Sequence, residues 1–395
     1  MSAAEGLTRE QVLSVYRQVL DRMPLDEEVE HQLATLSSLE ELLRVALDSD
    51  EYAARLGPER HPPRTAHATA VVNVFHPDFA QWGHQPGKRS DDGIAIVGHE
   101  GWLFLCGGTN ANLGQYVGQI EMEPTWLDEW REVVAQREAQ ARALRVPTAL
   151  VIVPDKLAVY EQHYPESLVR AGPRPVERML ASGDLPVVYP LAQLRDAATR
   201  EAVYLRTDTH LSFRGNALLF DAVRDALAFD AALDLDELPV RSYVAPGDLG
   251  VKFEPSIVEV ITSPGTLHRA RIAEDNREAI AAAGGHIGTR RVFVNDDAPD
   301  ARTIVVFGDS FGFAADNYQG LAWFLAQVFH ETHFVWVPFG WDPDYVRAVG
   351  AGLVVMQGAE RFAARVPRPA VEVAALERDA LGLQQPLGFD AAFGR

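Results

Sequence analysis

Hydrophobic residues in the first part of the chain recur at the spacing of short amphipathic helices. Thr8 with Gln11 and Ser38 with Glu41 have the three-residue spacing of a capping box, which marks the start of a helix. The apolar positions that follow Thr8 at helical intervals are Val12, Leu13, Tyr16, Val19 and Leu20. Residues 7–57 are therefore predicted to form two or three short helices.

Beyond a proline-rich stretch, short apolar runs alternate with longer stretches of helical periodicity. The runs predict strands at residues 148–153, 186–189, 202–205, 291–294, 303–307, 333–337 and 353–356. Helices are expected at about residues 124–144, 212–227 and 319–329. This alternation predicts an α/β fold, a three-layer α/β/α sandwich around a mainly parallel sheet. Residues 242–300 are polar and weakly patterned, so we expect a functional loop over the active site there.

These patterns divide the chain into a helical module at 1–57, a linker at 58–69, a main domain at 70–385 and a tail at 386–395. The linker carries three prolines and has little apolar content. Because this linker would separate the module from the main domain, we expect each of them to have a hydrophobic core of its own.

A candidate nucleophile follows the apolar run at 303–307, in the tetrapeptide Gly308-Asp309-Ser310-Phe311. A β-branched and aromatic run that stops at a glycine is typical of a buried strand in a parallel sheet. Residues just past such a strand lie at the carboxyl edge of the sheet, where α/β proteins place their chemistry. Ser310 is thus a candidate nucleophile. Asp309 is expected to cap the turn, with a contact to substrate as the alternative.

A serine hydroxyl needs an imidazole to take its proton and a carboxylate to orient that imidazole. Asp208 and His210 could supply both, because residues two apart in an extended segment point to the same side. The alternative is a surface or core pair without a catalytic role. If the pair is catalytic, His210 should lie within hydrogen-bond reach of Ser310 or a little beyond, with Asp208 on the other ring nitrogen.

Together these motifs resemble the SGNH-hydrolase-like proteins of alginate O-acetylation, the AlgX and AlgJ group. After Asp208-Thr209-His210 come Ser212, Arg214 and Gly215, and the Gly-Asp-Ser-Phe tetrapeptide follows later. Further blocks agree with the family in order, namely Val97-Gly98-His99-Glu100-Gly101-Trp102-Leu103-Phe104, Val153-Pro154-Asp155-Lys156-Leu157-Ala158-Val159-Tyr160, Gly247-Asp248-Leu249-Gly250 and Glu360-Arg361-Phe362.

The resemblance implies a circularly permuted SGNH-like domain with a triad of Asp208, His210 and Ser310, in which the serine comes last. It implies a carbohydrate O-acetyltransferase that acetylates a saccharide or glycoconjugate hydroxyl through an acyl-serine. Leu211 and Asn216 stand where the family commonly has Trp and Ala, so no sugar-stacking side chain is implied at position 211. The alternatives are an acetyl esterase with the same triad and a non-catalytic glycan-binding or scaffold protein.

The segment at 15–22, together with Ser49-Asp50-Glu51-Tyr52, resembles the small DUF4214-type domain found beside carbohydrate-active enzymes. This second resemblance implies that the module could recruit glycosyltransferases. The alternative is a helical extension that covers the main domain.

Several residues near the motifs are candidates for substrate binding. The backbone N–H of Ser310 is the expected oxyanion donor, with Asn317 and Tyr318 as further partners. The cations nearest the motifs, which could bind the phosphates of an acyl-CoA, are Lys156, Arg206, Arg214 and Lys252.

Charge and composition exclude several classes of binding partner. The net charge of -20 over 395 residues argues against nucleic acid and against an anionic membrane surface. The one cysteine, Cys106, excludes an internal disulfide and is expected to be buried. No Cys/His cluster has zinc-site spacing, so no metal is expected, and His330 and His333 are interpreted as surface histidines.

The sequence as given begins without the basic start and apolar stretch of a signal peptide. It also lacks a run of about eighteen apolar residues that could span a membrane. We therefore expect a cytoplasmic protein with no bound cofactor, for which acetyl-CoA would be at hand as the acetyl donor.

Overall fold

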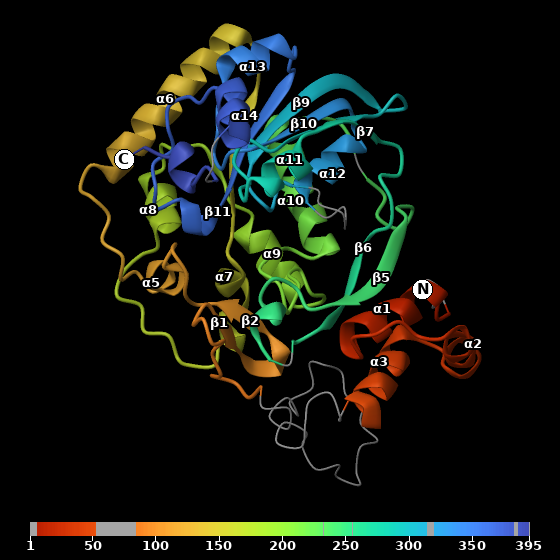
Figure 1. The fold of residues 1–395 in the computed structure, drawn as a ribbon. Coiled ribbons are helices and arrows are strands. Elements are labelled where there is room, and N and C mark those ends of the chain that lie inside the picture. Colours follow the sequence, from red (N-terminus) through yellow and green to blue (C-terminus); the bar gives the residue numbers. More distant parts are fainter. Residues whose placement is uncertain are drawn as a thin grey trace.

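A seven-stranded sheet forms the centre of the protein in a computed structural model (Figure 1). The structure describes residues 6–52, 84–231, 233–254, 256–313, 320–382 and 386–394. In spatial order the strands are β4 (Val187–Val188), β3 (Thr148–Val153), β11 (Leu353–Ala359), β9 (Asp300–Gly308), β10 (Phe329–Trp336), β8 (Arg290–Val294) and β7 (Arg271–Asp275). The predicted linker at 58–69 lies outside the described residues.

The first five strands in this order run parallel, and β8 and β7 extend the sheet as antiparallel strands. In β11 every residue is buried, and in β3 all but the first are. A strand buried on both faces reads as a continuous apolar run, which is why these strands were predictable. Strand β9 lies in the middle of the sheet, so the residues after Gly308 emerge at the centre of its carboxyl edge.

Helices cover both faces of the sheet (Figure 1). Helix α6 packs against α13, and the indole N–H groups of Trp126 and Trp130 both donate to the carbonyl of Ala363. Helix α10, capped by the hydroxyl of Ser212, packs against α9 and α12. The bounds of these and the remaining helices of the main domain are α5 (Asn112–Tyr116), α6 (Trp126–Leu144), α7 (Lys156–Tyr160), α8 (Pro175–Ser182), α9 (Leu191–Ala198), α10 (Phe213–Leu227), α11 (Arg277–Ala282), α12 (Leu321–Ala326), α13 (Pro343–Ala348) and α14 (Val373–Gly382).

Two predicted elements differ from the structure. No strand forms at 202–205, where Tyr204 makes only a single bridge to Leu211. The helix predicted at 319–329 is shorter, because Phe329 already belongs to β10 and is paired with Asp300 of β9. At 319–329 the pairing with β9, a long-range contact that local periodicity cannot report, ends the helix.

The segment at 242–300 is not one long loop. It contains the antiparallel hairpin of β5 (Val240–Ala245) and β6 (Glu259–Pro264), then β7 and α11. All five residues of β7 are exposed, so this strand gave no apolar signal in the sequence.

Helix α1 (Arg9–Val19) packs on β5 of the hairpin, and helices α2 (Asp26–Thr35) and α3 (Leu39–Leu47) pack against α1. The Ser14 hydroxyl donates to the carbonyl of Val244 at 3.2 Å and accepts from the N–H of the same residue at 3.3 Å. The module and the main domain share one hydrophobic cluster, and the main domain contributes to it Ala95, Val97, Leu103, Val244, Leu249, Phe253, Ile257 and Val258. The module therefore shares its core with the main domain, whereas a second cluster lies wholly within the main domain. The predicted domain boundaries themselves stay a prediction.

A two-stranded sheet of β1 (Ala95–Val97) and β2 (Leu103–Leu105) lies below the main sheet in Figure 1. Cys106, just after β2, is buried as predicted. The surface interpretation is wrong for His333, which is buried on β10 between the hydroxyl of Tyr345 at 2.7 Å and the carboxylate of Glu331 at 2.5 Å. Within the described ranges, no helix is long and apolar enough to cross a membrane.

Because they share this hydrophobic cluster, we expect the N-terminal helices to contribute to the stability of the main domain. Val15→Asp places a carboxylate at a fully buried position, and we expect the midpoint of thermal unfolding to fall by about 5 °C or more. Gln18→Asp makes the same change of charge at an exposed position of α1 and should leave the midpoint within about 1 °C of the wild type. Equal melting temperatures for the two variants, measured by circular dichroism, would contradict the shared cluster.

Candidate active site

The turn that carries Ser310 is held by the buried carboxylate of Asp309. Its Oδ1 accepts from the N–H of Phe311 at 2.9 Å and from the side-chain amide of Gln357 at 2.8 Å. Its Oδ2 accepts from the N–H of Ala359 at 2.6 Å. Gln357 and Ala359 belong to β11, so Asp309 ties the end of β9 to the neighbouring strand and leaves Ser310 half-buried at the sheet edge.

Glycine is required directly before this turn because Gln357 approaches closely. A Cβ atom added to Gly308 would lie 2.5 Å from the Gln357 Oε1 atom, and one added to Gly312 would lie 2.8 Å from it. The same Oε1 accepts from the N–H of Asp309 at 3.1 Å. Gln357 therefore contacts the turn on both sides of Ser310.

Asp208 and His210 form a tight turn rather than the extended segment that we expected. The Asp208 Oδ1 atom accepts from the backbone N–H of His210 at 2.9 Å and from the His210 Nδ1 atom at 2.6 Å. The side chains still meet, but they do so through a turn closed by the aspartate. With Nδ1 donating to a carboxylate, Nε2 is the nitrogen left to act as a base.

The electrostatics of the pair follow from burial and from the two opposite charges. Burial favours neutral Asp208, but the imidazolium of His210 outweighs it and lowers the pKa of the aspartate well below its usual range. Burial likewise lowers the pKa of His210, yet the Asp208 carboxylate outweighs it and the net pKa is raised above 6.5. His210 is thus a stronger base than a free imidazole.

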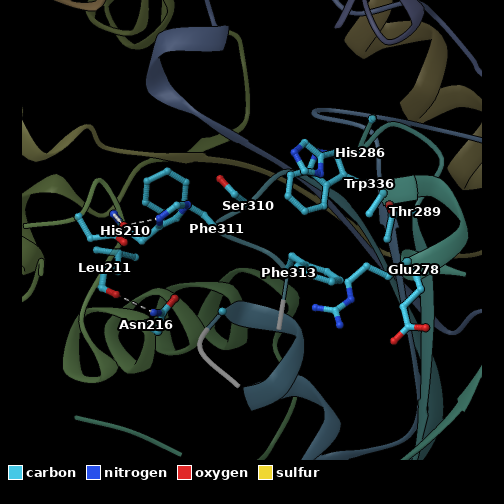
Figure 2. A pocket seen from close by; sticks show the side chains of 15 residues that line it. His210, Leu211, Asn216, Glu278, His286, Thr289, Ser310, Phe311, Phe313 and Trp336 are labelled. Carbon is cyan, nitrogen blue, oxygen red and sulfur yellow. Dashed lines mark hydrogen bonds and ion pairs between the residues drawn. The ribbon is translucent and has the colours of Figure 1, made fainter. Parts of the chain in front are cut away.

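A cavity of about 490 Å³ joins this pair to the serine turn (Figure 2). Asp208, His210 and Ser310 all line it, and the ring of Phe311 lies 5.0 Å from the His210 ring. The His210 Nε2 atom is buried and has no hydrogen-bond partner in the described part of the chain. The predicted hydrogen bond from Ser310 to this atom is therefore not formed in this structure.

The far wall of the cavity is aromatic and lies beyond Ser310, as seen from His210 (Figure 2). Here the exposed His286 ring is stacked on Trp336, with ring centres 4.8 Å apart and planes at 20°. Glu278 of α11 lies beyond Ser310 as well (Figure 2), and Arg277 of the same helix also lines the cavity. At position 211, where the family resemblance would place a Trp, the buried Leu211 lines the cavity instead.

The four cations that were predicted to bind substrate contact other protein groups in the structure. Lys156 is buried and donates to the carbonyls of Leu103 and Arg206, at 2.8 and 3.0 Å. The guanidinium of Arg206 donates to the backbone carbonyl of Glu100 at 2.8 Å and lies over the ring of Trp102. The other two pair with carboxylates, namely Arg214 with Glu201 and Lys252 with Asp92. Among the residues that line the cavity, none of the four occurs.

The remaining candidates divide in two. Asp309 is buried, and both of its carboxylate oxygens accept hydrogen bonds from protein groups, so its carboxylate caps the turn. Asn317 and Tyr318 lie outside the described residues, and their predicted role as oxyanion donors stays a prediction.

A metal could be considered at Asp208, His210 and Asp248, whose side-chain ligand atoms lie within 4.8 Å of one another. The carboxylate oxygens of this group already accept hydrogen bonds from protein N–H and O–H groups, Asp248 from Thr209 and Asp208 from His210 and Asp248. We therefore interpret the group as a hydrogen-bonded network.

Three residues near the site had no role in holding the Asp208–His210 pair or the serine turn predicted from the sequence. Asp248 contacts the Asp208 turn, and Gln357 holds Asp309. Arg361 pairs with Asp155 at 2.8 Å and lies over the ring of Phe311. Asp248, Arg361 and Asp155 all fall within the blocks that resembled a known family, whereas Gln357 had no signal beyond being a polar residue in an apolar run.

A sheet with a serine turn at its carboxyl edge and an Asp-His turn on the same cavity defines a hydrolase-like α/β protein of the SGNH type. A family model described as SGNH hydrolase-like domain, acetyltransferase AlgX, matches residues 95–331. The chain belongs to this family of SGNH hydrolase-like acetyltransferases.

Several solved structures resemble the chain at low identity. The O-acetyltransferase domain of Pseudomonas putida AlgJ is 16% identical, with 72% of this chain and 99% of that chain covered and a TM-score of 0.43. Bacillus cereus PatB1 with a sulfonyl adduct is 12% identical, with 72% and 97% covered and a TM-score of 0.44. Pseudomonas aeruginosa AlgX is 12% identical, with 73% and 65% covered and a TM-score of 0.37. Comparison with curated proteins gave no match.

The contact between Gln357 and the serine turn can be tested directly. Gln357→Met keeps the size of the side chain but removes the partner of the Asp309 N–H and one of the two donors to its Oδ1, and we expect a loss of about 2 kcal/mol in the free energy of unfolding. Gln136→Met, at an exposed position of α6, should change it by less than about 0.5 kcal/mol. Urea unfolding measures both values, and a Gln357 variant as stable as its control would show that the amide does not hold the turn.

Proposed function

We propose that this chain is a carbohydrate O-acetyltransferase that works through an acetyl-serine at Ser310. The observation that carries the proposal is the buried Nε2 atom of His210, which has no hydrogen-bond partner among the described residues and lies in the cavity that Ser310 also lines. A buried polar atom without a partner costs free energy unless a ligand or a reacting group supplies the partner. Membership of an acetyltransferase family supports the reaction class.

In the first step His210 Nε2 takes the proton of the Ser310 hydroxyl, and the oxygen attacks the carbonyl carbon of an acetyl ester or thioester. The tetrahedral intermediate collapses, its bond to the leaving group breaks, and the leaving group receives the proton from His210. Asp208 holds the imidazole and stabilises its charged form. The backbone N–H of Ser310 is our proposed donor to the oxyanion.

In the second step a saccharide hydroxyl gives its proton to His210 and attacks the acetyl-serine. The acetyl group moves to the sugar oxygen, and Ser310 recovers its proton from His210. We assign the acceptor to the wall of His286, Trp336, Arg277 and Glu278, because an aromatic stack beside charged hydrogen-bonding groups matches a sugar ring with its hydroxyls. This wall replaces the aromatic side chain missing at position 211.

Acetyl-CoA remains one candidate donor. Its phosphates would need cations near the site, and the four predicted for this role make their contacts elsewhere. A small acetyl ester or thioester presented by another protein fits the cavity without such a cluster. The cytoplasmic location and the recruitment of glycosyltransferases by the N-terminal helices both stay predictions.

The triad is tested with 4-nitrophenyl acetate. Ser310→Ala and His210→Ala should each lower kcat/KM by about 1,000-fold or more, and the double variant should be little worse than either, because the two groups act as a unit. Ser167→Ala changes an exposed serine outside this cavity and should keep wild-type activity. Folding of each variant is checked by circular dichroism. Activity in a folded Ser310→Ala variant would assign the reaction to another nucleophile.

Transfer is separated from hydrolysis by adding acceptors. The enzyme is incubated with acetyl-CoA or 4-nitrophenyl acetate and with cellopentaose, chitopentaose or a glucuronic acid oligomer, and acetylated sugar is detected by mass spectrometry. We expect His286→Ala to raise KM for the acceptor about tenfold with unchanged ester hydrolysis, whereas His31→Ala, exposed on α2, changes neither. Acetate as the only product with every acceptor would favour the esterase, which shares the triad and uses water.

A further inference from the structure

Asp248 lies in a second turn, Gly247 to Gly250, that is interlocked with the turn of the candidate base. The N–H of Asp248 donates to Asp208 Oδ2 at 2.9 Å. In return, the N–H of Thr209 donates to Asp248 Oδ1 at 2.7 Å, and the Thr209 hydroxyl donates to Asp248 Oδ2. Each turn thus places its carboxylate on a backbone N–H of the other turn.

The backbone of the second turn is shaped for this close approach. Gly247 has a φ of +32°, and a Cβ atom there would lie 2.5 Å from the Thr207 carbonyl oxygen and 2.7 Å from the Cβ of Asp208. The N–H groups of Leu249 and Gly250 donate to the same Thr207 carbonyl, at 3.0 and 2.9 Å. Side chains at the glycine position would push the two turns apart.

The Asp248 carboxylate also acts on the histidine through space. Its Oδ2 lies 3.8 Å from His210 Nδ1, next to the direct hydrogen bond from Asp208. The charged groups that bear on His210 are therefore Asp208 and Asp248, which favour the imidazolium, and Arg361, which opposes it. Asp248 stays partly exposed, with 42% of its side chain accessible, so its charge acts on the histidine through a partly solvated gap.

We propose that Asp248 is a positioning residue of the acetyl-transfer site, which orients Asp208 by its backbone N–H and stabilises protonated His210 by its charge. The proposal rests on the proposed function, since it assigns His210 the role of base. The effect of the Asp248 charge on His210 distinguishes this role from that of a merely structural turn. A neutral residue at position 248 keeps the backbone N–H but removes the charge, so the pH at which His210 loses its proton must change.

The test measures kcat/KM for 4-nitrophenyl acetate from pH 5 to pH 9 in Asp248→Asn. Activity needs neutral His210 and is lost as the pH falls through the pKa of that group. Removing a negative charge destabilises the charged form of His210 and lowers its pKa. The midpoint of the acid limb of the pH profile should therefore move to lower pH by about 0.5 to 1 unit. Above the midpoint, kcat/KM should fall by about tenfold, because the imidazolium formed during the reaction loses part of its stabilisation.

Two further variants separate charge from geometry. Asp248→Glu keeps the charge on a longer side chain and should retain the wild-type midpoint with a lower kcat. Asp225→Asn removes a charge of the same sign at an exposed position of α10 and should change neither quantity. Should Asp248→Asn melt well below the wild type, Asp248→Ser supplies a second neutral variant whose hydroxyl can still accept from Thr209.

An acid midpoint that is the same in folded Asp248→Asn or Asp248→Ser as in the wild type overturns the proposal, whatever the loss of rate. Loss of wild-type activity in EDTA with recovery on adding Zn²⁺ also overturns it, because the carboxylates would then bind a metal. These failures are distinct from that of the proposed function, which fails if Ser310→Ala stays active.

Discussion

The hydrogen bonds that Asp309 accepts from Phe311, Gln357 and Ala359 are the constraint on which the serine turn depends. A buried carboxylate is costly unless each oxygen is paired, and here two of the three donors come from the adjacent strand β11. The pairing of β9 with β11 and the geometry of the Ser310 turn therefore depend on each other. The sheet does more than support the site, because it supplies the atoms that fix the direction of Ser310.

A buried ionic network lies beside this turn at the same sheet edge. Arg361 pairs with Asp155, and Glu360 pairs with Arg174 at 2.7 Å and accepts from the hydroxyl of Tyr189 at 2.7 Å. Burial raises the pKa of Glu360 to about 7, in spite of its arginine partner. Such a network adds little net stability, but it fixes the side chains that it contains, including the guanidinium over Phe311.

Elements and site residues could be predicted from the sequence where a local pattern determines them, and not where a contact between distant parts of the chain does. The strands 148–153, 303–307 and 353–356 were predictable because burial on both faces leaves an unbroken apolar run. Short motifs singled out Ser310 and Asp208–His210, which line one cavity, and their catalytic role stays a prediction. Strand β7 could not be found, since its residues are all exposed. The roles of Asp248 and Gln357 were hidden as well, because each acts on a residue about forty to fifty positions away. Lys156 was assigned to substrate from its charge alone, and only its burial against two carbonyls shows its structural contacts.

The Asp208–His210 pair and the Ser310 turn differ in how far apart in the sequence their hydrogen-bond partners lie. The bond between Asp208 and His210 spans two residues, whereas the Asp309 carboxylate needs Gln357 and Ala359, which are 48 and 50 residues further on. During synthesis the ribosome releases the chain from its amino end, so Asp208 and His210 can form their hydrogen bond before the Ser310 turn acquires its support from β11. A nascent chain that ends before β11 lacks two of the three donors to Asp309. The direction of Ser310 is in this way fixed only after β11 has joined the sheet.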